Sequence, residues 1–225
     1  FVIKNWPRSG ARIKLGLVQT QFLDSTFAVM GALCKADNVV SRDEIRAAEA
    51  LFARLHLTGE RRQAAIAAFN RGKAEGFDLD GEVARLRQVC RGNRALLQLF
   101  LQVQLVAITA DGAVHPAEHA MLLRVAYGLG LSQREVDQLE ALLRASSSGA
   151  SSGGSAPRRK LDDAYAALGV SESDSDAEIK RAYRRLMSQN HPDKLAGKGL
   201  PESMREMAEE RSREITTAYA LIKEA

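Results

Sequence analysis

The sequence has only two cysteines, Cys34 and Cys90, and they lie far apart without a C-x-x-C motif. This scarcity argues against a cysteine-based zinc site and against a disulfide framework, and it fits a reduced, cytosol-facing protein. Long apolar runs are also missing, because the apolar start of the chain is interrupted at once by Lys4. No stretch reaches the roughly 18 to 20 apolar residues that cross a bilayer, so the chain as given is expected to be soluble.

Charge of one sign is also scarce. The 32 Lys and Arg residues are interspersed with 28 Asp and Glu, which leaves a formal net charge of +4. This balance gives only weak support for nucleic-acid binding, so any role of charge must be local. With 45% hydrophobic and 27% charged residues, the chain has the composition of a globular protein with one or two cores.

The first residues indicate that something upstream has been removed. The chain begins with Phe1 rather than Met, and residues 1–14 carry the basic side chains of Arg8, Arg12 and Lys14. We therefore expect a segment before Phe1, and we interpret residues 1–14 as a basic, juxtamembrane-like segment.

Alternating strand patterns are absent between Leu15 and about Ala145, where apolar residues follow a helical spacing nearly throughout. The same spacing resumes after Pro157. The predicted fold class is therefore all-α. The predicted helices cover residues 17–36, 41–55, 59–70, 81–90, 94–110, 116–129, 133–145, 161–168, 176–190 and about 204–223.

A repeat relates two parts of the first domain. Residues 36–44 read ADNVVSRDE, and residues 110–118 read ADGAVHPAE. In each, a long apolar helix is predicted to end at Ala-Asp, a turn at Asn38 or Gly112 comes next, and a new helix begins. The repeat predicts two related helix-turn-helix units, with the two long helices paired at the centre of a bundle.

Several predicted helices begin with recognisable signals. An S-x-x-E capping box satisfies backbone N–H groups that the first turn of a helix leaves unpaired. Proline suits the first helical position because its missing N–H would be unpaired there in any case. The capping boxes are Ser41 with Glu44, Ser132 with Glu135 and Ser175 with Glu178, and Pro116 stands behind His115.

Serine and glycine dominate residues 146–157. Such a composition buries too little apolar surface to offset the entropy of ordering, so this stretch is predicted to be a flexible linker. The predicted organisation is thus the basic segment 1–14, a helical domain at 15–145, this linker, and a second helical unit at 158–225.

The second unit contains a basic helix that ends at a proline turn. Pro192 disfavours the α conformation at the residue before it, so the helix should stop near Asn190 and leave His191, Pro192 and Asp193 at an exposed exit. The helical period separates an arc to be buried from a basic one. The first arc contains Ile179, Ala182, Tyr183, Leu186 and Asn190, and the second contains Lys180, Arg181, Arg184 and Arg185.

These motifs resemble the J-domain of DnaJ-type co-chaperones over residues 160–225. The matching stretches are LGV at 168–170, IKRAYRRL at 179–186, HPDK at 191–194, EI at 214–215, AY at 218–219 and LI at 221–222. Two features depart from the family pattern: Ala164-Tyr165 replaces the frequent tyrosine pair, and the loop after Asp193 is long. The first 150 residues are similar to the TerB-like domain, and the order of the two domains resembles that of membrane-anchored DnaJ-like co-chaperones of Gram-negative bacteria.

The resemblance implies a TerB-like helical bundle, a linker and a J-domain helical hairpin. It further implies a regulatory co-chaperone and not an enzyme, with no catalytic residue, metal or cofactor of its own. In this family, the basic helix docks on a DnaK-type chaperone ATPase and the His-Pro-Asp turn promotes ATP hydrolysis. The partner-binding residues implied here are Lys180, Arg181, Arg184, Arg185, His191, Pro192, Asp193 and Lys194.

The resemblance also concerns location. It implies that the N-terminal region localises or dimerises the protein, and that an N-terminal anchor outside this chain holds the longer protein at the cytoplasmic face of the bacterial inner membrane. Clients and pathway are not specified by any motif.

Two other interpretations stay open. The basic helix is also compatible with a nucleic-acid or membrane surface, although no nucleic acid is expected as a partner. His115 and His119 lie one helical turn apart, which would suit a metal-dependent stress sensor, but the first repeat has Ser41 and Ile45 at these positions. The candidate metal ligands are Asp37, Asp111, His115, Glu118 and His119.

Overall fold

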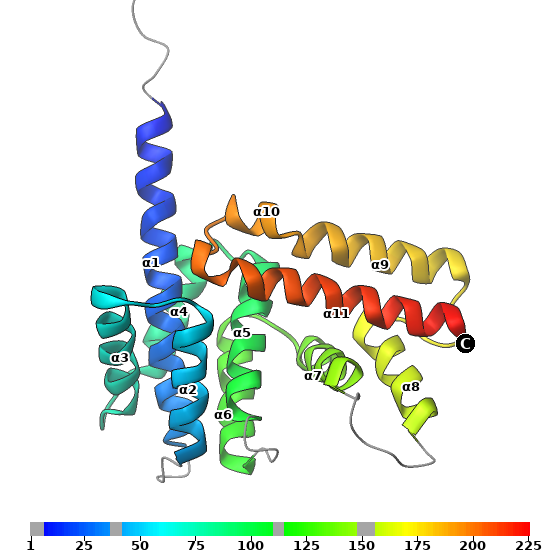
Figure 1. The fold of residues 1–225 in the computed structure, drawn as a ribbon, viewed down its shortest axis with the longest axis horizontal. Helices are drawn as coiled ribbons and strands as arrows, with labels where there is room; N and C mark the ends of the chain where they lie inside the picture. The colour runs from blue at the N-terminus through cyan, green and yellow to red at the C-terminus, as the bar shows by residue number, and fades with distance from the viewer. Residues whose placement is uncertain (1–6, 37–41, 110–114, 148–155) are drawn as a thin grey trace, which may run out of the picture. The chain divides into compact units, whose positions relative to one another are not determined.

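All regular secondary structure is helical in the part of the chain that the computed structural model describes, residues 7–36, 42–109, 115–147 and 156–225 (Figure 1). The all-α prediction is confirmed. The elements are α1 (Pro7–Cys34), α2 (Arg42–Arg54), α3 (Gly59–Lys73), α4 (Leu79–Val89), α5 (Arg94–Ile108), α6 (Pro116–Gly128), α7 (Gln133–Ser147), α8 (Ala156–Leu168), α9 (Asp176–Asn190), α10 (Pro192–Ala196), the 3₁₀ turn η1 (Glu202–Met204) and α11 (Arg205–Glu224).

Three differences from the predicted helix limits involve proline. α8 begins at Ala156, one residue before Pro157, and not at Leu161. α1 begins at Pro7 and not at Leu17. Pro192 ends the preceding helix, as predicted, but it also begins the five-residue helix α10, which was not predicted. Proline is compatible with the first turn of a helix because no intrahelical acceptor awaits its missing N–H there.

The chain divides into two compact units. The first comprises residues 1–130 and 196–205, and the second comprises residues 131–195 and 206–225, so α7 belongs to the second unit. The predicted domain limits stay predictions. Most of the Ser/Gly linker, at 148–155, lies outside the described residues.

In the first unit, two glycines allow α1 and α3 to pack with their backbones in contact. A Cβ atom on Gly31 would lie 2.1 Å from the carbonyl oxygen of Phe69, and one on Gly72 would lie 1.8 Å from that of Ala28. Real carbon atoms do not approach a carbonyl oxygen so closely, so any larger residue would force the two helices apart.

α1 also packs against α5, which confirms the predicted pairing of the two long helices. The rings of Phe22 and Phe100 meet edge to face with centroids 5.9 Å apart. The Gln104 side-chain amide donates a hydrogen bond of 3.0 Å to the carbonyl of Thr26. The predicted turns at Asn38 and Gly112, and the capping box at Ser41, lie outside the described residues.

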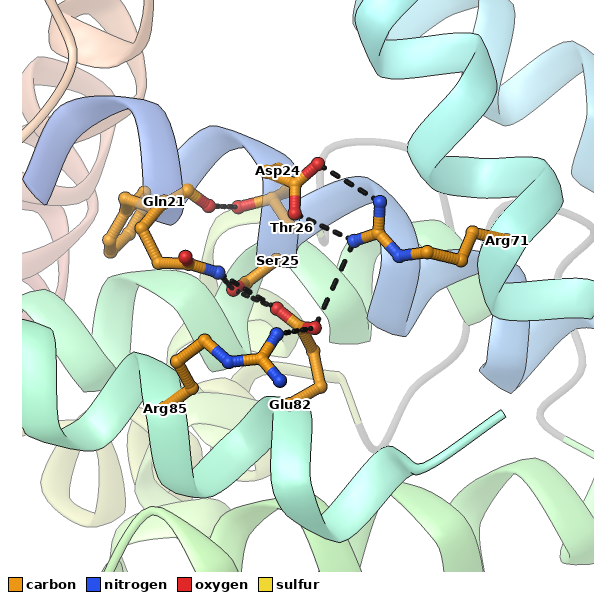
Figure 2. Close-up of polar contacts among 8 residues, drawn as sticks. Gln21, Asp24, Ser25, Thr26, Arg71, Glu82 and Arg85 are labelled. Atoms are coloured by element: carbon orange, nitrogen blue, oxygen red, sulfur yellow. Dashed lines mark hydrogen bonds and ion pairs between the residues drawn. The ribbon is translucent and has the colours of Figure 1, made fainter. Parts of the chain in front are cut away.

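A buried carboxylate links three helices of the first unit (Figure 2). Glu82 of α4 is only 3% exposed. It accepts hydrogen bonds from Ser25 at 2.6 Å and Gln21 at 3.0 Å, both on α1, and from Arg85 at 2.9 Å. Arg71 of α3 lies 3.8 Å away. Since these partners compensate the buried charge, the cluster fixes how α1, α3 and α4 pack.

The second unit has its own core, built from α7, α8, α9 and α11. Its buried residues are Ala141, Leu142, Ala164, Ala167, Leu168, Ile179, Ile215, Ala218 and Ile222. α9 and α11 form an antiparallel hairpin: Lys223 pairs with Asp176 at 2.9 Å at one end, and Ser212 contacts Asn190 at 3.3 Å at the other. The predicted helical hairpin is present.

Candidate partner-binding site

The candidate site begins with α9, whose start is held by the predicted capping box. The Ser175 hydroxyl accepts from the Glu178 N–H at 3.4 Å, and the Glu178 carboxylate accepts from the Ser175 N–H at 2.9 Å. The hydrogen bonds from Ser175 are the main reason that the pKa of Glu178 lies below its usual value, with a smaller contribution from Arg181. The helix is thus fixed at its first turn.

α9 presents opposite chemistry on its two faces. Ile179 and Ala182 are buried, and the ring of Tyr183 stacks on Tyr219 of α11 with centroids 4.3 Å apart and an interplanar angle of 11°. The four predicted cations all project into solvent: Lys180, Arg181, Arg184 and Arg185. The helix is therefore anchored along one side and offers positive charge on the other.

At the end of α9, the side chain of His191 caps the next helix. His191 adopts φ −60° and ψ 128°, outside the helical region. Its ring nitrogen Nδ1 accepts a hydrogen bond of 3.2 Å from the N–H of Asp193. An accepting Nδ1 carries no proton, so in the neutral ring the proton resides on Nε2. The imidazole therefore holds the turn with one nitrogen and keeps an N–H donor on the other.

Two residues of this turn, His191 and Asp193, are exposed, and Pro192 between them is half-buried. The side chains of His191 and Asp193 are 53% and 65% exposed. Lys194 folds back toward α9, where its ammonium group donates to the Ser188 hydroxyl at 2.6 Å. The predicted cations thus lie on the exposed side of α9, and the turn and Lys194 follow directly at its end.

α11 carries two buried charged residues that the sequence did not single out as functional. Arg211 and Glu214 of α11 are 3% and 8% exposed. Burial lowers the pKa of Arg211 to about 10, and the negative charge of Glu214 opposes this effect. Arg211 stands four positions from both Met207 and Ile215, so the helical period alone could have placed it on the buried face.

Three of the candidate metal ligands, His115, Glu118 and His119, lie within the described residues, at the start of α6. His115 caps α6: its Nδ1 accepts from the N–H of Ala117 at 3.4 Å, and the Glu118 carboxylate accepts from the His115 N–H at 3.0 Å. Asp37 and Asp111 lie outside the described residues. Within the described ranges, no three His, Cys, Asp or Glu residues form a group that could hold a metal ion.

The helices also bear on the question of a membrane span. Across residues 7–36, 42–109, 115–147 and 156–225, none of them combines the length and the apolar character that a span requires.

Two family models match the chain. The model for tellurite resistance protein TerB matches residues 24–141, and the model for the DnaJ domain matches residues 163–225. No solved structure matches.

Similar proteins cover nearly the whole chain. A protein from Photobacterium profundum, named co-chaperone protein DjlA, is 44% identical over 215 residues, which is 91% of this chain and 78% of the relative. Proteins with the same name are 42% identical in Vibrio vulnificus and 41% identical in Escherichia coli O157:H7. The match to the Vibrio protein covers 91% of this chain and 78% of the relative, and the match to the Escherichia protein covers 92% and 80%.

Proposed function

The chain belongs to the DjlA family of co-chaperones, and from this premise we propose that its J-domain stimulates ATP hydrolysis by a DnaK-type chaperone. The observation that carries the proposal is the exposed His191-Pro192-Asp193 turn at the end of a basic helix that is anchored on α11. A docking element needs a fixed position and an accessible surface, and this turn has both.

The cations of α9 act first. Lys180, Arg181, Arg184 and Arg185 attract a negatively charged surface of the chaperone and orient the encounter. Because these side chains are exposed, salt screens the attraction and the complex is short-lived. A regulator that must leave after each ATPase cycle requires such a weak encounter.

The turn acts second. The Asp193 carboxylate accepts hydrogen bonds from an arginine of the chaperone. Pro192 limits the backbone at the start of α10, and His191 caps that helix while its Nε2–H faces the partner. The co-chaperone contributes no catalytic group; it shifts the ATPase toward the conformation that hydrolyses ATP.

The first unit supplies the location. In this proposal, the TerB-like region positions or dimerises the protein, and a longer form is held at the cytoplasmic face of the bacterial inner membrane. The J-domain chemistry is then general, and specificity comes from where the turn is presented.

The test compares two histidines that cap helices in the same way. The ATPase rate of a DnaK-type chaperone is measured with the wild-type chain, His191→Gln and the control His115→Gln. Stimulation is expected from the wild type and from His115→Gln, and at saturating concentration none from a folded His191→Gln. Full stimulation by folded His191→Gln, or none by the wild type, would contradict the proposal.

A gel shift with nucleic acid and a flotation assay with anionic vesicles address the other interpretation of the basic helix. Salt-sensitive binding to either, without any effect on the ATPase, would replace the co-chaperone mechanism with a surface-binding role.

A further inference from the structure

The peptide group that enters the His191-Pro192-Asp193 turn is held from behind by α11. The last turn of a helix leaves its carbonyl groups without intrahelical partners, and Pro192 removes one further N–H donor from this region. The Ser212 hydroxyl donates to the Asn190 carbonyl at 3.3 Å, across 22 residues of sequence. The acceptor belongs to the peptide group that joins Asn190 to His191.

The side chain of Asn190 is itself held in the last turn of α9. It is 0% exposed, and its Nδ2–H donates to the carbonyl of Leu186 at 2.9 Å. Its Oδ1 atom is buried and has no hydrogen-bond partner. An unpaired buried acceptor costs stability, so an apolar residue would serve the core better at this position.

A chain of contacts thus leads from α11 to the exposed turn. Ser212 binds the peptide that precedes His191, and the His191 ring binds the backbone N–H of Asp193 at 3.2 Å. Both bonds act on the backbone from which the Asp193 side chain projects. We propose that Ser212 and Asn190 are positioning residues that set the orientation of the His191-Pro192-Asp193 turn for docking, an inference that rests on the proposed function.

The Ser212 hydroxyl has one hydrogen and two acceptors within reach, the carbonyl of Asn190 at 3.3 Å and that of Ala208 at 3.0 Å. Alanine at this position would leave the Asn190 carbonyl without its α11 donor and would let the entering peptide rotate. The helix itself would be little affected, because a serine that bonds back to its own helix contributes little to helix stability.

Thr216 provides a matched control. It lies one turn farther along α11, bonds back to Ser212 at 2.9 Å and contacts the Met187 sulfur at 3.8 Å. It therefore has the same chemistry and also faces α9, but it does not contact the backbone of the turn.

The experiment measures chaperone ATPase stimulation against concentration for the wild type, Ser212→Ala, Ser212→Thr and Thr216→Ala, all as the 225-residue chain. Ser212→Ala is expected to lower maximal stimulation about fivefold, with little change in the half-saturating concentration, and Ser212→Thr is expected to restore it. Thr216→Ala should match the wild type. In the NMR spectrum, the amide of Asp193 should shift in Ser212→Ala alone.

The outcomes separate the two proposals. If the wild type does not stimulate the ATPase, the proposed function fails. If the wild type stimulates and Ser212→Ala equals it, the positioning role fails while the function stands. A loss in Ser212→Ala that Thr216→Ala reproduces, together with an equal fall in melting temperature, would also overturn the positioning role, because it would indicate general loosening of the hairpin.

Discussion

Two His-Pro dipeptides begin helices in this protein, one at α6 and one at α10. In both, Nδ1 of the histidine accepts from the backbone N–H two residues later, at 3.4 Å for Ala117 and 3.2 Å for Asp193. In both, proline occupies the first helical position. At both places, the His-Pro dipeptide therefore starts a helix.

The two sites differ in the residues that come after the dipeptide. At α6, Glu118 is 6% exposed and closes a capping box on His115, and a 13-residue helix continues. At α10, the nearest acidic residue is Asp193, which is 65% exposed on a five-residue helix behind a basic surface. The His-Pro dipeptide alone therefore does not indicate docking. The proposed docking rests on the exposed Asp193 carboxylate and on the basic helix before it.

The largest expected effect separates the two carboxylates. Asp193→Asn should lower the ATPase stimulation more than about tenfold, because in the proposed mechanism this carboxylate docks on the chaperone. Glu118→Gln should leave stimulation unchanged and lower the free energy of unfolding by about 1 kcal/mol, because it weakens only a helix cap. ATPase assays and urea unfolding of both variants check this. Equal effects of the two substitutions would break the comparison.

A smaller effect is expected when both histidines become asparagine, which keeps an acceptor for the cap. His191→Asn should retain α10 but lower stimulation about fivefold, because the Nε2–H donor is lost. His115→Asn should change neither stability nor stimulation. NMR of the Ala117 and Asp193 amides reports the caps. A fully active His191→Asn would mean that the cap, and not the second nitrogen, is the feature that the chaperone requires.

The cations of α9, the helix that precedes the α10 turn, are expected to contribute less individually. Arg184→Gln should raise the half-saturating concentration about threefold at low salt, and the difference should shrink as salt is added. Arg61→Gln, an exposed arginine on α3, is the matched control and should have no effect. A loss that is insensitive to salt would argue against electrostatic steering.

The smallest effect concerns acid stability of the second unit. A hydrogen bond from Lys223 and its positive charge hold the pKa of Asp176 below its usual value. Hydrogen bonds from Ser175 lower the pKa of Glu178 in the same way. A carboxyl group with a lowered folded-state pKa stabilises the fold above its unfolded pKa, about 4, and loses this contribution as pH falls through the folded value. Glu178→Gln should therefore flatten the decline of the melting temperature below about pH 4. An unchanged acid profile would mean that the ionised Glu178 carboxylate of the capping box does not stabilise α9.

Much of the site could be predicted because it lies on one helix and the turn after it. The helical period separates Tyr183 from Arg184, and Pro192 marks the end of α9, so local rules suffice for these residues. The start of α10 at Pro192 was not predicted, because this proline was interpreted only as the end of α9. Proline also favours the first position of a helix. The repeat turns and the Ser/Gly linker lie outside the described residues and stay predictions.

The support behind the turn could not be predicted. The contact between Ser212 and Asn190 depends on the position of α11 along α9, and a single sequence does not specify that register. The sequence does not predict the close approach of Gly31 and Gly72 to the facing helix either, because an isolated glycine in a helical pattern has several explanations.

The most direct test of the central claim is single-turnover ATP hydrolysis by a DnaK-type chaperone, measured with and without the wild-type chain and with Asp193→Asn. The account predicts faster hydrolysis with the wild type, saturable and weakened by salt, and less than about a tenth of that acceleration with folded Asp193→Asn. Equal rates with and without the wild-type chain, or equal acceleration by both chains, would contradict it.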